Sequence, residues 1–406
     1  MGRYRSKPMM HLFINALAAS AGGGLTYIRN VIPYLATTPE VRVTVALGHD
    51  LQDELRGFAS IDFVKLDAPA IRRFWYEQAV LPDLIRRSHA DVLLSAGNFA
   101  LRNSPLPQIL LSRNSLYTSD DFYRDLRSRR EYSEWLATHM RAALAKRSIH
   151  WAEVTVAPSE AFAAELRRWA GVNVRTIHHG FDQAAFTRDS SPLSSDVEEK
   201  LRSADGSLRI LFVSPYNYYR NFETLIRALQ LLRNLLPGRS IKLLLTCKLA
   251  AGQNPGAYRP EAAARLVRSL GVSHSVVELG AIPYSQLHQI YRRADIYATP
   301  AYAETFAHPL VEAMASGLPI VASDLAVHRE VCGEAALYFP RFSPEALAEC
   351  VVRLAASVET SSRMAALGLE RLRLFSWKTH VDKMLELART LVRPIPPSAN
   401  KVGTLL

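Results

Sequence analysis

Two glutamates and one arginine are the residues of this chain whose types and surroundings indicate chemistry. Glu304 and Glu312 lie in the segment AYAETFAHPLVEAMASGLPIVASD, and Arg220 lies in ILFVSPYNYYRNFETLIRAL. A carboxylate beside a bound sugar or ribose can accept hydrogen bonds from two hydroxyl groups. A guanidinium can bind two oxygens of a phosphate. These side chains predict a site for a ligand that carries both hydroxyl groups and phosphate.

The segment around the glutamates predicts a helix that begins just after a strand. The expected strand covers Asp295–Ala298, and Pro309 suits the first helical position, where its missing amide proton costs nothing. Gly317 is typical of the end of a helix. The free backbone amides of residues 306–308 would then form an anion site at the carboxyl end of the strand, best suited to a phosphate or diphosphate.

The segment around Arg220 has the same organisation. A strand is expected to end near Ser214, and Asn221 is a good cap for the following helix. A positive charge beside a helix N-terminus is unfavourable unless an anion lies between the two. Arg220 therefore indicates a second contact to the anion, and an ordinary surface arginine stays open as the alternative.

The two glutamates also have plain structural explanations. Glu304 could be a solvated loop carboxylate, and Glu312 could be an acid that stabilises the first helical turn. A carboxylate pair of a glycoside hydrolase is a further alternative. It is weaker, because nothing in the sequence indicates a raised pKa and the expected fold differs from that of most such enzymes.

Other motifs exclude several classes of protein. Gly22, Gly23 and Gly24 follow the first expected strand and let the backbone approach a ligand, but they do not form the G-x-G-x-x-G of a dinucleotide site. The phosphate-loop pattern of NTPases and the G-x-S-x-G of hydrolases do not occur in the sequence. His178-His179-Gly180 lacks a third ligand at metal-site spacing, so we predict no metal site.

Short apolar runs alternate with amphipathic helical stretches, which is typical of βαβ units around parallel sheets. The expected strands of the first half are His11–Asn15, Val41–Leu47, Ile61–Leu66, Asp91–Ser95, Gln108–Ser112, Val154–Ala157 and Val174–His178. Those of the second half are Arg209–Ser214, Lys242–Thr246, Val276–Leu279, Asp295–Ala298, Ile320–Ala322 and Ala336–Phe339. A long helical pattern lies near residues 123–152, and residues 187–207 are polar without an apolar period.

We therefore predict an α/β protein with two Rossmann-like domains that face a central cleft. Residues 1–190 form the first domain, residues 191–207 a linker, and residues 208–375 the second domain. Residues 376–406 form a C-terminal helix that packs back towards the first domain, followed by a loose tail.

Composition supports a globular protein of two domains. The chain has 406 residues, of which 49% are hydrophobic and 21% charged, so disorder as the main state is excluded. The net charge of +11 favours phosphate-bearing partners such as nucleotides, nucleic acid or an anionic membrane. Since the surplus is spread over the chain, a dedicated nucleic-acid patch is disfavoured.

Localisation is expected to be cytoplasmic, with peripheral contact to the inner face of the membrane left open. Cys247, Cys332 and Cys350 are an odd, scattered set, which points to a reducing compartment. No apolar run reaches the ~18 residues of a membrane span. The basic N-terminus followed by MMHLFINALAASA looks like a signal peptide, but His11 and Asn15 interrupt the run, so we predict a first strand there.

The segment ETFAHPLVEAMASGLPIVASD resembles the signature of the retaining family-4 glycosyltransferases of the GT-B fold, an E-x7-E motif followed by a Gly-Pro turn. Here these residues are Glu304, Glu312, Gly317 and Pro319. The resemblance extends over nearly the whole chain, through GGGLTYIRNVIPYL, VAPSEAFAAEL, IHHGFD, FVSPYNYYRNFETLIRAL, GEAALYF and FSW.

This resemblance implies roles for single residues. Glu304 would bind hydroxyl groups of the donor sugar, Glu312 the ribose, and Arg220 the diphosphate, with Glu304 and Arg220 as the catalytic residues. Further donor contacts would come from Phe306, Ala307, His308, Gly23, Gly24, Gly280 and Ser214. Candidates on the acceptor side are Arg113, Asn114 and Asn98.

The chain departs from the family pattern at three places. Pro215 stands where relatives often have a second basic residue, which Lys248 could replace. Ala307 replaces a glycine, and alanine fits there without strain only if its φ is negative. The histidine that many relatives carry in the first domain has no counterpart at Arg113.

The resemblance implies transfer of a sugar from a nucleotide-diphosphate donor to an acceptor hydroxyl with retention at the anomeric carbon, in assembly of bacterial surface polysaccharide or glycolipid. The expected partners are the nucleotide sugar as co-substrate and a glycan or lipid-linked glycan as acceptor, without a cofactor, a metal ion or nucleic acid. Open alternatives are a sugar-nucleotide epimerase or phosphorylase on the same fold, and a basic nucleic-acid-binding module.

Overall fold

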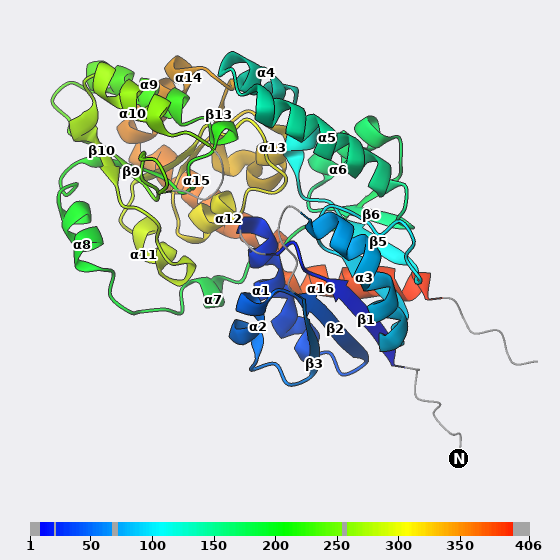
Figure 1. The fold of residues 1–406 in the computed structure, drawn as a ribbon. Coiled ribbons are helices and arrows are strands. Elements are labelled where there is room, and N and C mark those ends of the chain that lie inside the picture. The colour runs from blue at the N-terminus through cyan, green and yellow to red at the C-terminus, as the bar shows by residue number, and fades with distance from the viewer. Residues whose placement is uncertain (1–8, 20–21, 67–71, 254–257, 393–406) are drawn as a thin grey trace, which may run out of the picture. The chain divides into compact units, whose positions relative to one another are not determined.

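A computed structural model of the chain describes residues 9–19, 22–66, 72–253 and 258–392. Its internal contacts divide the chain into two compact units (Figure 1). The first unit comprises Met1–Arg113, Ala145–Val156 and Lys378–Leu406, and the second comprises Asn114–Leu144 and Ala157–Trp377. The chain therefore changes from one unit to the other at four positions.

The first unit is built on a parallel sheet. The described part of the chain forms a seven-stranded sheet in the order β3-β2-β1-β4-β5-β6-β7. Its strands are β1 (Met10–Asn15), β2 (Val41–Leu47), β3 (Ile61–Lys65), β4 (Val92–Ser95), β5 (Gln108–Leu111), β6 (Val154–Ala157) and β7 (Val174–Thr176), of which β7 falls within the residues of the second unit. In the central strand β1, Leu12 lies opposite Val43 on one side and Val92 on the other. The strand order reverses between β1 and β4, which is the point where doubly wound sheets bind ligands.

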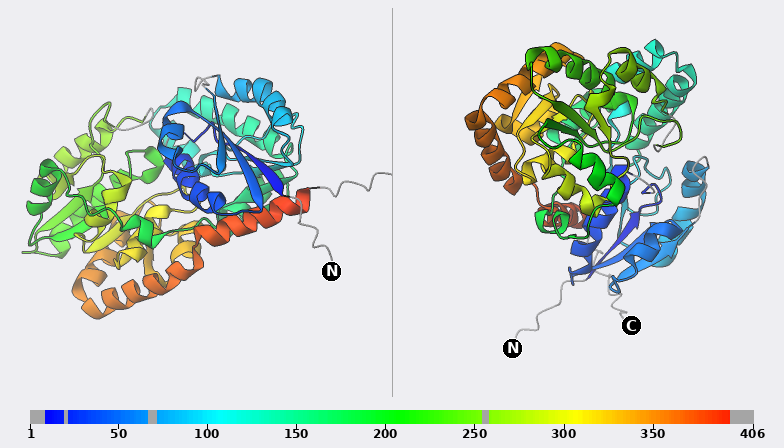
Figure 2. Two further views of the ribbon diagram at one scale, coloured as in Figure 1. Left: turned by 90° about the horizontal axis from the view of Figure 1, so that it is seen from below. Right: turned by 90° about the vertical axis from the view of Figure 1, so that its left-hand side faces the viewer.

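The first unit also contains helices. Those of the first unit are α1 (Gly22–Ala36), α2 (His49–Leu55), α3 (Arg73–Ser88) and most of α16 (Trp377–Leu391). Figure 2 shows α16 in red beside the blue elements of this unit. Its His380 ring meets Tyr27 of α1 edge-on, with 3.2 Å between Nε2 and the phenol oxygen. Arg389 pairs with Glu40 at 3.2 Å. The C-terminal helix is thus part of the first unit.

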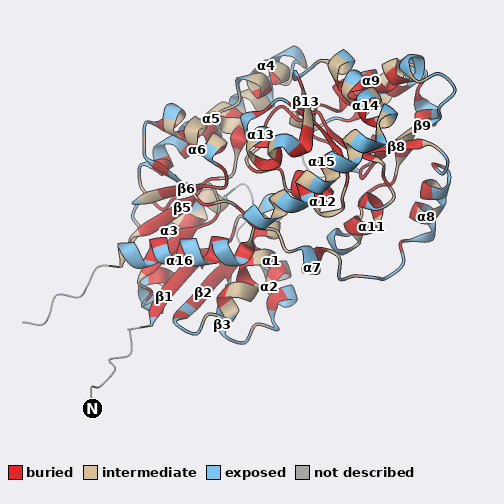
Figure 3. Ribbon diagram, turned by 180° about the vertical axis from the view of Figure 1, so that it is seen from behind, coloured by how far each residue is buried: buried red, intermediate tan, exposed pale blue. Residues whose placement is uncertain are grey.

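The second unit holds another parallel sheet, in the order β10-β9-β8-β11-β12-β13. Its strands are β8 (Leu208–Phe212), β9 (Ile241–Leu245), β10 (Val276–Glu278), β11 (Ile296–Thr299), β12 (Ile320–Ser323) and β13 (Ala336–Phe339). The strands are short and largely buried, as the red ribbon of β8 and β9 in Figure 3 shows. The order reverses between β8 and β11, where Ile210 lies opposite Ile296.

The second unit also contains a series of helices. They are α4 (Asp120–Ser128), α5 (Tyr132–Ile149, up to Leu144), α6 (Glu160–Ala170), α7 (Gln183–Phe186), α8 (Ser195–Arg202), α9 (Phe222–Leu235), α10 (Glu261–Ser269), α11 (Leu287–Tyr291), α12 (His308–Ala315), α13 (Ala326–Cys332), α14 (Pro344–Ala356) and α15 (Val358–Arg371). A core of leucine, isoleucine, valine and aromatic side chains from β8, β9 and α9 packs beneath them.

The predicted α/β class with two parallel sheets is confirmed. Two local features differ from what the sequence patterns indicated. The polar stretch 187–207, in which no apolar period was found, contains α8, which Ser194 caps and which buries Val197 and Leu201. The long helical pattern near residues 123–152 is two helices, because the chain turns at Arg130, whose φ of 60° lies in the left-handed region.

Candidate functional site

The loop between β11 and α12 carries Glu304 and is held by its main chain. Three other segments of the second unit reach this loop through four hydrogen bonds. The hydrogen bonds run from Asn221 Nδ2 to the Pro300 carbonyl (3.1 Å), from Ser323 Oγ to the Ala301 carbonyl, from the Tyr302 amide to the Tyr219 carbonyl (3.0 Å), and from Ser159 Oγ to the Thr305 carbonyl (2.7 Å). Glu304 therefore stands on a rigid loop rather than a mobile one.

The helix after this loop begins and ends near the predicted positions. It covers His308–Ala315 with proline in its first turn, and Gly317 follows with a φ of 69° and an amide that donates to the Met314 carbonyl. Ala307 precedes the helix with a φ of 63°, in the left-handed region. This is the conformation that glycine adopts freely and alanine does not. The departure from the family's glycine thus introduces backbone strain at the start of α12.

Arg220 and Glu304 form an ion pair. Nη1 of the arginine contacts Oε1 of the glutamate, and the two side chains are only 18% and 11% exposed. The guanidinium also lies over the Tyr219 ring, with Cζ 5.1 Å from its centroid. Its Nε is buried without a hydrogen-bond partner among the described residues. The arginine therefore keeps a donor available for a further acceptor.

The position of this pair follows from the topology of the sheet. Arg220 lies in the connection after β8, and Glu304 lies in the loop after β11. These two strands are neighbours at the point where the strand order reverses. Loops diverge there and leave room for a ligand at the carboxyl ends of the strands. The two residues, 84 positions apart in the sequence, thus meet where an open α/β sheet binds its ligand.

Asn221 contributes differently from the prediction. It precedes α9 with a φ of 55° and makes no side-chain cap to that helix. Its amide instead donates to the loop after β11, and its Oδ1 accepts from the Thr224 hydroxyl at 2.9 Å. The residue therefore connects the two loops that carry Arg220 and Glu304.

Glu312 lies in the interior. Its side chain is buried in α12 and accepts a hydrogen bond of 2.8 Å from the Tyr291 hydroxyl. Burial raises the pKa of Glu312 to about 7, although hydrogen bonds from Tyr291 and Tyr284 act in the opposite direction. The sequence contained no sign of this raised pKa. The hydroxyl groups of a ribose bound at this carboxylate would have to replace the tyrosine hydroxyls as hydrogen-bond donors.

The remaining predicted donor contacts lie in three places. Phe306 is buried among aromatic rings, 5.5 Å from His179 and 5.0 Å from His308 between ring centroids. Gly280 has a φ of 85°, and a side chain there would meet Lys248 at 3.4 Å. Ser214 is buried, and its amide donates to Thr246 at 3.1 Å.

Most residues predicted in the first unit hold its loops. Arg113 donates at 2.6 Å to the carbonyls of Gly23 and Ala96, which follow β1 and β4, and lies over the Tyr27 ring. Burial lowers the pKa of Arg113 to about 10. The Asn98 side chain accepts from the Arg113 amide at 2.6 Å. Arg113 and Asn98 therefore serve the fold here. A side chain at Gly24 would lie 3.2 Å from the backbone of the preceding loop.

Asn114, the third candidate on the acceptor side, belongs to the second unit. Its side-chain oxygen accepts from the Leu116 amide at 3.1 Å and caps a short 3-10 helix over Ser115–Tyr117. This helix leads directly into α4.

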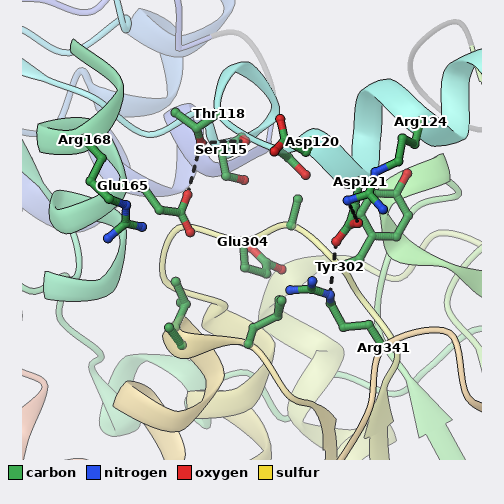
Figure 4. A pocket seen from close by; sticks show the side chains of 15 residues that line it. Ser115, Thr118, Asp120, Asp121, Arg124, Glu165, Arg168, Tyr302, Glu304 and Arg341 are labelled. Atoms are coloured by element: carbon green, nitrogen blue, oxygen red, sulfur yellow. Dashed lines mark hydrogen bonds and ion pairs between the residues drawn. The ribbon is translucent and has the colours of Figure 1, made fainter.

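A pocket of about 300 Å³ opens beside Glu304 within the second unit (Figure 4). Its wall is formed by the start of α4, by α6, by the loop after β11, by the start of α13 and by Arg341. Arg220 and residues 306–308 do not line it. Glu304 is thus the one predicted catalytic residue that the ion pair and the pocket share.

Apart from Glu304, the charged side chains of the pocket were not identified by the sequence analysis. Asp121 accepts from Arg124 at 3.0 Å and from Arg341 at 3.1 Å, and Thr118 donates to Glu165 at 3.0 Å. In the charged stretch 124–130, Arg129 is mostly buried and paired with Asp125 and Glu223. No spacing in the sequence connects these segments, because the pocket depends on their packing.

Two findings concern membranes and metals. Every helix among the described residues is too short or too polar to cross a bilayer. The same residues contain no group of three or more histidine, cysteine or acidic side chains placed to hold a metal ion.

Comparisons with known proteins place this geometry in a family. Residues 21–185 match the family model described as Glycosyltransferase Family 4, and residues 195–370 match Glycosyl transferases group 1. The chain is 31% identical over 185 residues to D-inositol 3-phosphate glycosyltransferase of Corynebacterium glutamicum, which is 44% of this chain and 42% of that protein. It is 34% identical over 126 residues to the protein of the same name in Nocardia farcinica, 31% of this chain and 27% of the relative. The chain matches less than half of the length of these two relatives.

Solved structures share the whole fold. Sucrose-phosphate synthase from Thermosynechococcus elongatus has a TM-score of 0.70 at 19% identity and covers 94% of this chain and 99% of its own. The Anabaena protein HepE in complex with UDP-glucose has a TM-score of 0.71 at 18% identity and covers 94% and 100%. The predicted GT-B fold is confirmed, while retention and the role of the E-x7-E motif stay predictions. With both family domains in order along one chain, the protein belongs to the glycosyltransferases of the GT-B fold.

Proposed function

We propose that this protein transfers a sugar from a nucleotide-diphosphate donor to a hydroxyl group of an acceptor, with retention at the anomeric carbon. The observation that carries the proposal is the pairing of Arg220 with Glu304 where the strand order of the second sheet reverses. One of these side chains suits the diphosphate, and the other suits sugar hydroxyls. The HepE structure, which contains UDP-glucose, supports a donor of this class.

The ion pair explains how the site accommodates a donor. Without ligand, Glu304 balances the charge of Arg220. A diphosphate brings its own negative charge, so the guanidinium can turn to it, and the carboxylate is released to accept from the sugar. As the bond between the anomeric carbon and the phosphate oxygen breaks, the positive side chain stabilises the growing charge on the leaving group.

Retention requires the new bond to form on the face that the leaving group vacates. The acceptor oxygen attacks the anomeric carbon, and its proton passes to the leaving phosphate oxygen. The products are the glycoside and the free nucleotide diphosphate. Glu312 would hold the ribose of the donor, since its buried carboxylate already accepts hydrogen bonds from hydroxyl groups.

A panel of UDP-, GDP- and dTDP-sugars tests the proposal. We expect at least one of them to raise the melting temperature and to yield free nucleotide diphosphate, whereas an epimerase would convert the sugar without releasing it. Glu304→Gln should abolish the release. Glu198→Gln is the matched control, because Glu198 pairs with Arg293 elsewhere in the same unit. Release at the wild-type rate by Glu304→Gln would refute the assignment.

The acceptor is proposed to be a glycan or lipid-linked glycan of a bacterial surface polymer, reached at an anionic membrane. One face of α5 supports such contact. Tyr132, Leu136 and Met140 recur every fourth residue and are 62%, 55% and 66% exposed. Lys146 and Arg147 continue the helix with positive charge. Such a face suits the boundary between lipid headgroups and acyl chains.

Flotation with vesicles tests this contact. We expect the protein to float with phosphatidylglycerol vesicles at low salt and much less with neutral ones, since the attraction is partly electrostatic. Leu136→Glu should reduce flotation, while Leu369→Glu, at another exposed helix position, should not. Equal flotation of wild type and Leu136→Glu would remove α5 from the proposal.

A further inference from the structure

The pocket beside Glu304 contains polar side chains whose hydrogen-bonding capacity is not used by the fold. Asp120 has no hydrogen bond or ion pair through its side chain among the described residues, and Arg168 makes no ion pair there. Glu165 has a single donor, the Thr118 hydroxyl. In Figure 4, Glu165 and Arg168 lie on one side of Glu304, and Asp121 and Arg341 on the other.

The balance of charges restricts the ligand. Four carboxylates and three arginines line the pocket. A phosphate or carboxylate ligand would meet more negative than positive charge. A metal ion would need at least three ligand side chains placed around one point, and the described residues contain no such group of histidine, cysteine or acidic side chains. A ligand that both donates and accepts hydrogen bonds without net charge fits this wall best.

The environment of Glu165 agrees with this ligand. Its side chain is half-buried, and burial raises the pKa of its carboxyl group, while the Thr118 hydroxyl and the charges of Arg168 and Arg341 lower it. A partly desolvated carboxylate gains from each hydroxyl group that donates to it. Leu325 and Val327 add apolar surface to the same pocket, which suits the C–H groups of a sugar ring.

Glu304 connects the pocket with the proposed reaction centre at the ion pair. Glu304 belongs both to the pocket wall and to the ion pair with Arg220. A ligand in the pocket therefore lies next to the side chain that would hold the donor sugar. By contrast, the side chains of Arg113 and Asn98 form hydrogen bonds with the backbone of loops of the first unit.

We propose that this pocket is the acceptor subsite, and that it binds a neutral polyhydroxylated sugar unit through Asp120, Glu165 and Arg168. The inference rests on the proposed function, because it places the attacking hydroxyl next to the donor sugar held at Glu304. A volume of about 300 Å³ lies at the small end of ligand pockets, so the subsite receives one sugar unit at a time.

Binding of simple sugars to the full chain tests the subsite. The probes are D-glucose, D-mannose and N-acetyl-D-glucosamine, with D-glucose 6-phosphate as the charged comparison, measured by saturation-transfer difference NMR in the presence of UDP. We expect at least one neutral sugar to bind, and to bind more tightly than the phosphorylated one. Glu165→Gln and Arg168→Ala should each weaken this binding about tenfold, the loss of one hydrogen bond to a charged group.

Matched variants separate this effect from a loss of folding. Glu199→Gln and Arg268→Ala change exposed helical positions of the same unit and should bind the sugar as the wild type does. All four variants should keep the wild-type melting temperature, and the two control variants should also keep the wild-type rate of donor hydrolysis by water. Unchanged sugar binding in Glu165→Gln and Arg168→Ala, tighter binding of the phosphate ester, or no binding of any probe would overturn the subsite.

The result stays distinct from the test of the proposed function. If no nucleotide sugar is turned over but sugar binding still depends on Glu165 and Arg168, the pocket is a sugar site and the transferase assignment fails. If nucleotide diphosphate is released and the pocket variants bind sugar normally, the assignment stands and the acceptor binds elsewhere.

Discussion

Both sheets place an arginine at the point where their strand order reverses, but the two arginines are bound differently. In the first unit, Arg113 donates to two backbone carbonyls, one after β1 and one after β4. In the second unit, Arg220 pairs with the side chain of Glu304. A carbonyl oxygen that belongs to the main chain cannot leave without moving a loop, whereas a carboxylate can turn away. The same topology thus gives two different contacts. Arg113 is a fixed brace between two loops of the first unit, and Arg220 and Glu304 are an exchangeable pair in the second.

The largest expected effect is on activity, at the exchangeable pair. Arg220→Ala should lower the rate of donor cleavage by about 10²–10³-fold, the cost of removing one preorganised donor to a developing charge. The melting temperature should fall as well, because the largely buried Glu304 carboxylate loses its ion-pair partner. Steady-state release of nucleotide diphosphate and thermal unfolding measure the two effects. Loss of folding without loss of specific activity would make Arg220 a second brace.

The next effect is on stability, at the brace. Arg113→Ala should lower the free energy of unfolding by about 1–3 kcal/mol, because two carbonyls lose their donors. Arg113→Lys should recover part of this loss, since lysine keeps the charge but cannot span both oxygens as a planar fork does. Denaturant unfolding of both variants measures whether the free energy of unfolding of Arg113→Lys lies between those of Arg113→Ala and the wild type. If Arg113→Ala unfolds like the wild type, the comparison between the two arginines fails.

A smaller effect is on the pH dependence of stability. The pKa of Glu312 is about 7 in the folded chain, against 4.5 for an ordinary glutamate. Between these values the unfolded chain loses a proton that the folded chain keeps, so this group lowers stability as the pH rises, by about 1.4 kcal/mol for each unit of separation.

Substitution of Glu312 isolates that contribution. Glu312→Gln cannot ionise, so its melting temperature should fall less than that of the wild type between about pH 5 and pH 8. Glu199→Gln, at an exposed position, should follow the wild-type profile. Parallel profiles for the wild type and Glu312→Gln would show that Glu312 titrates near its ordinary value.

The smallest expected effect is at the start of α12. Ala307→Gly should raise stability by up to about 1 kcal/mol, because glycine adopts a φ of 63° without a Cβ clash while the unfolded chain gains some freedom. Thermal unfolding measures the gain, with Ala313→Gly, inside α12, as the destabilising control. A lower melting temperature for Ala307→Gly would show that packing of the alanine methyl group stabilises the fold by more than the backbone strain destabilises it.

The sequence predicted the strands, the two sheets and the loops that carry Arg220 and Glu304, since each depends on local apolar patterns and on glycine and proline at turns. It missed α8, although Ser194 and the acids that follow it are a recognisable helix start. It placed Glu312 by a motif but not its burial, which depends on Tyr291 packing against it from α11. Local patterns report which element forms, and long-range packing decides what surrounds it.

The pocket could not have been found in this way. Glu165, Asp120 and Arg341 lie on segments far apart in the sequence. Only Glu165 belongs to a segment that carries the family resemblance, VAPSEAFAAEL, and that resemblance implied no role for it. Each alone has the appearance of a solvated charge on a helix or loop. Their shared environment arises only when α4 and α6 pack near the loop after β11.

The main-chain anchoring of the Glu304 loop also bears on how this protein can change. Its four hydrogen bonds engage the backbone at residues 300, 301, 302 and 305 rather than side chains of the loop. A new side chain at residue 305, which is partly exposed, would thus leave the course of the backbone intact, whereas Ala303 is buried in the core. Evolution or a protein engineer can therefore change the surroundings of the Glu304 carboxylate at this position without displacing the carboxylate itself.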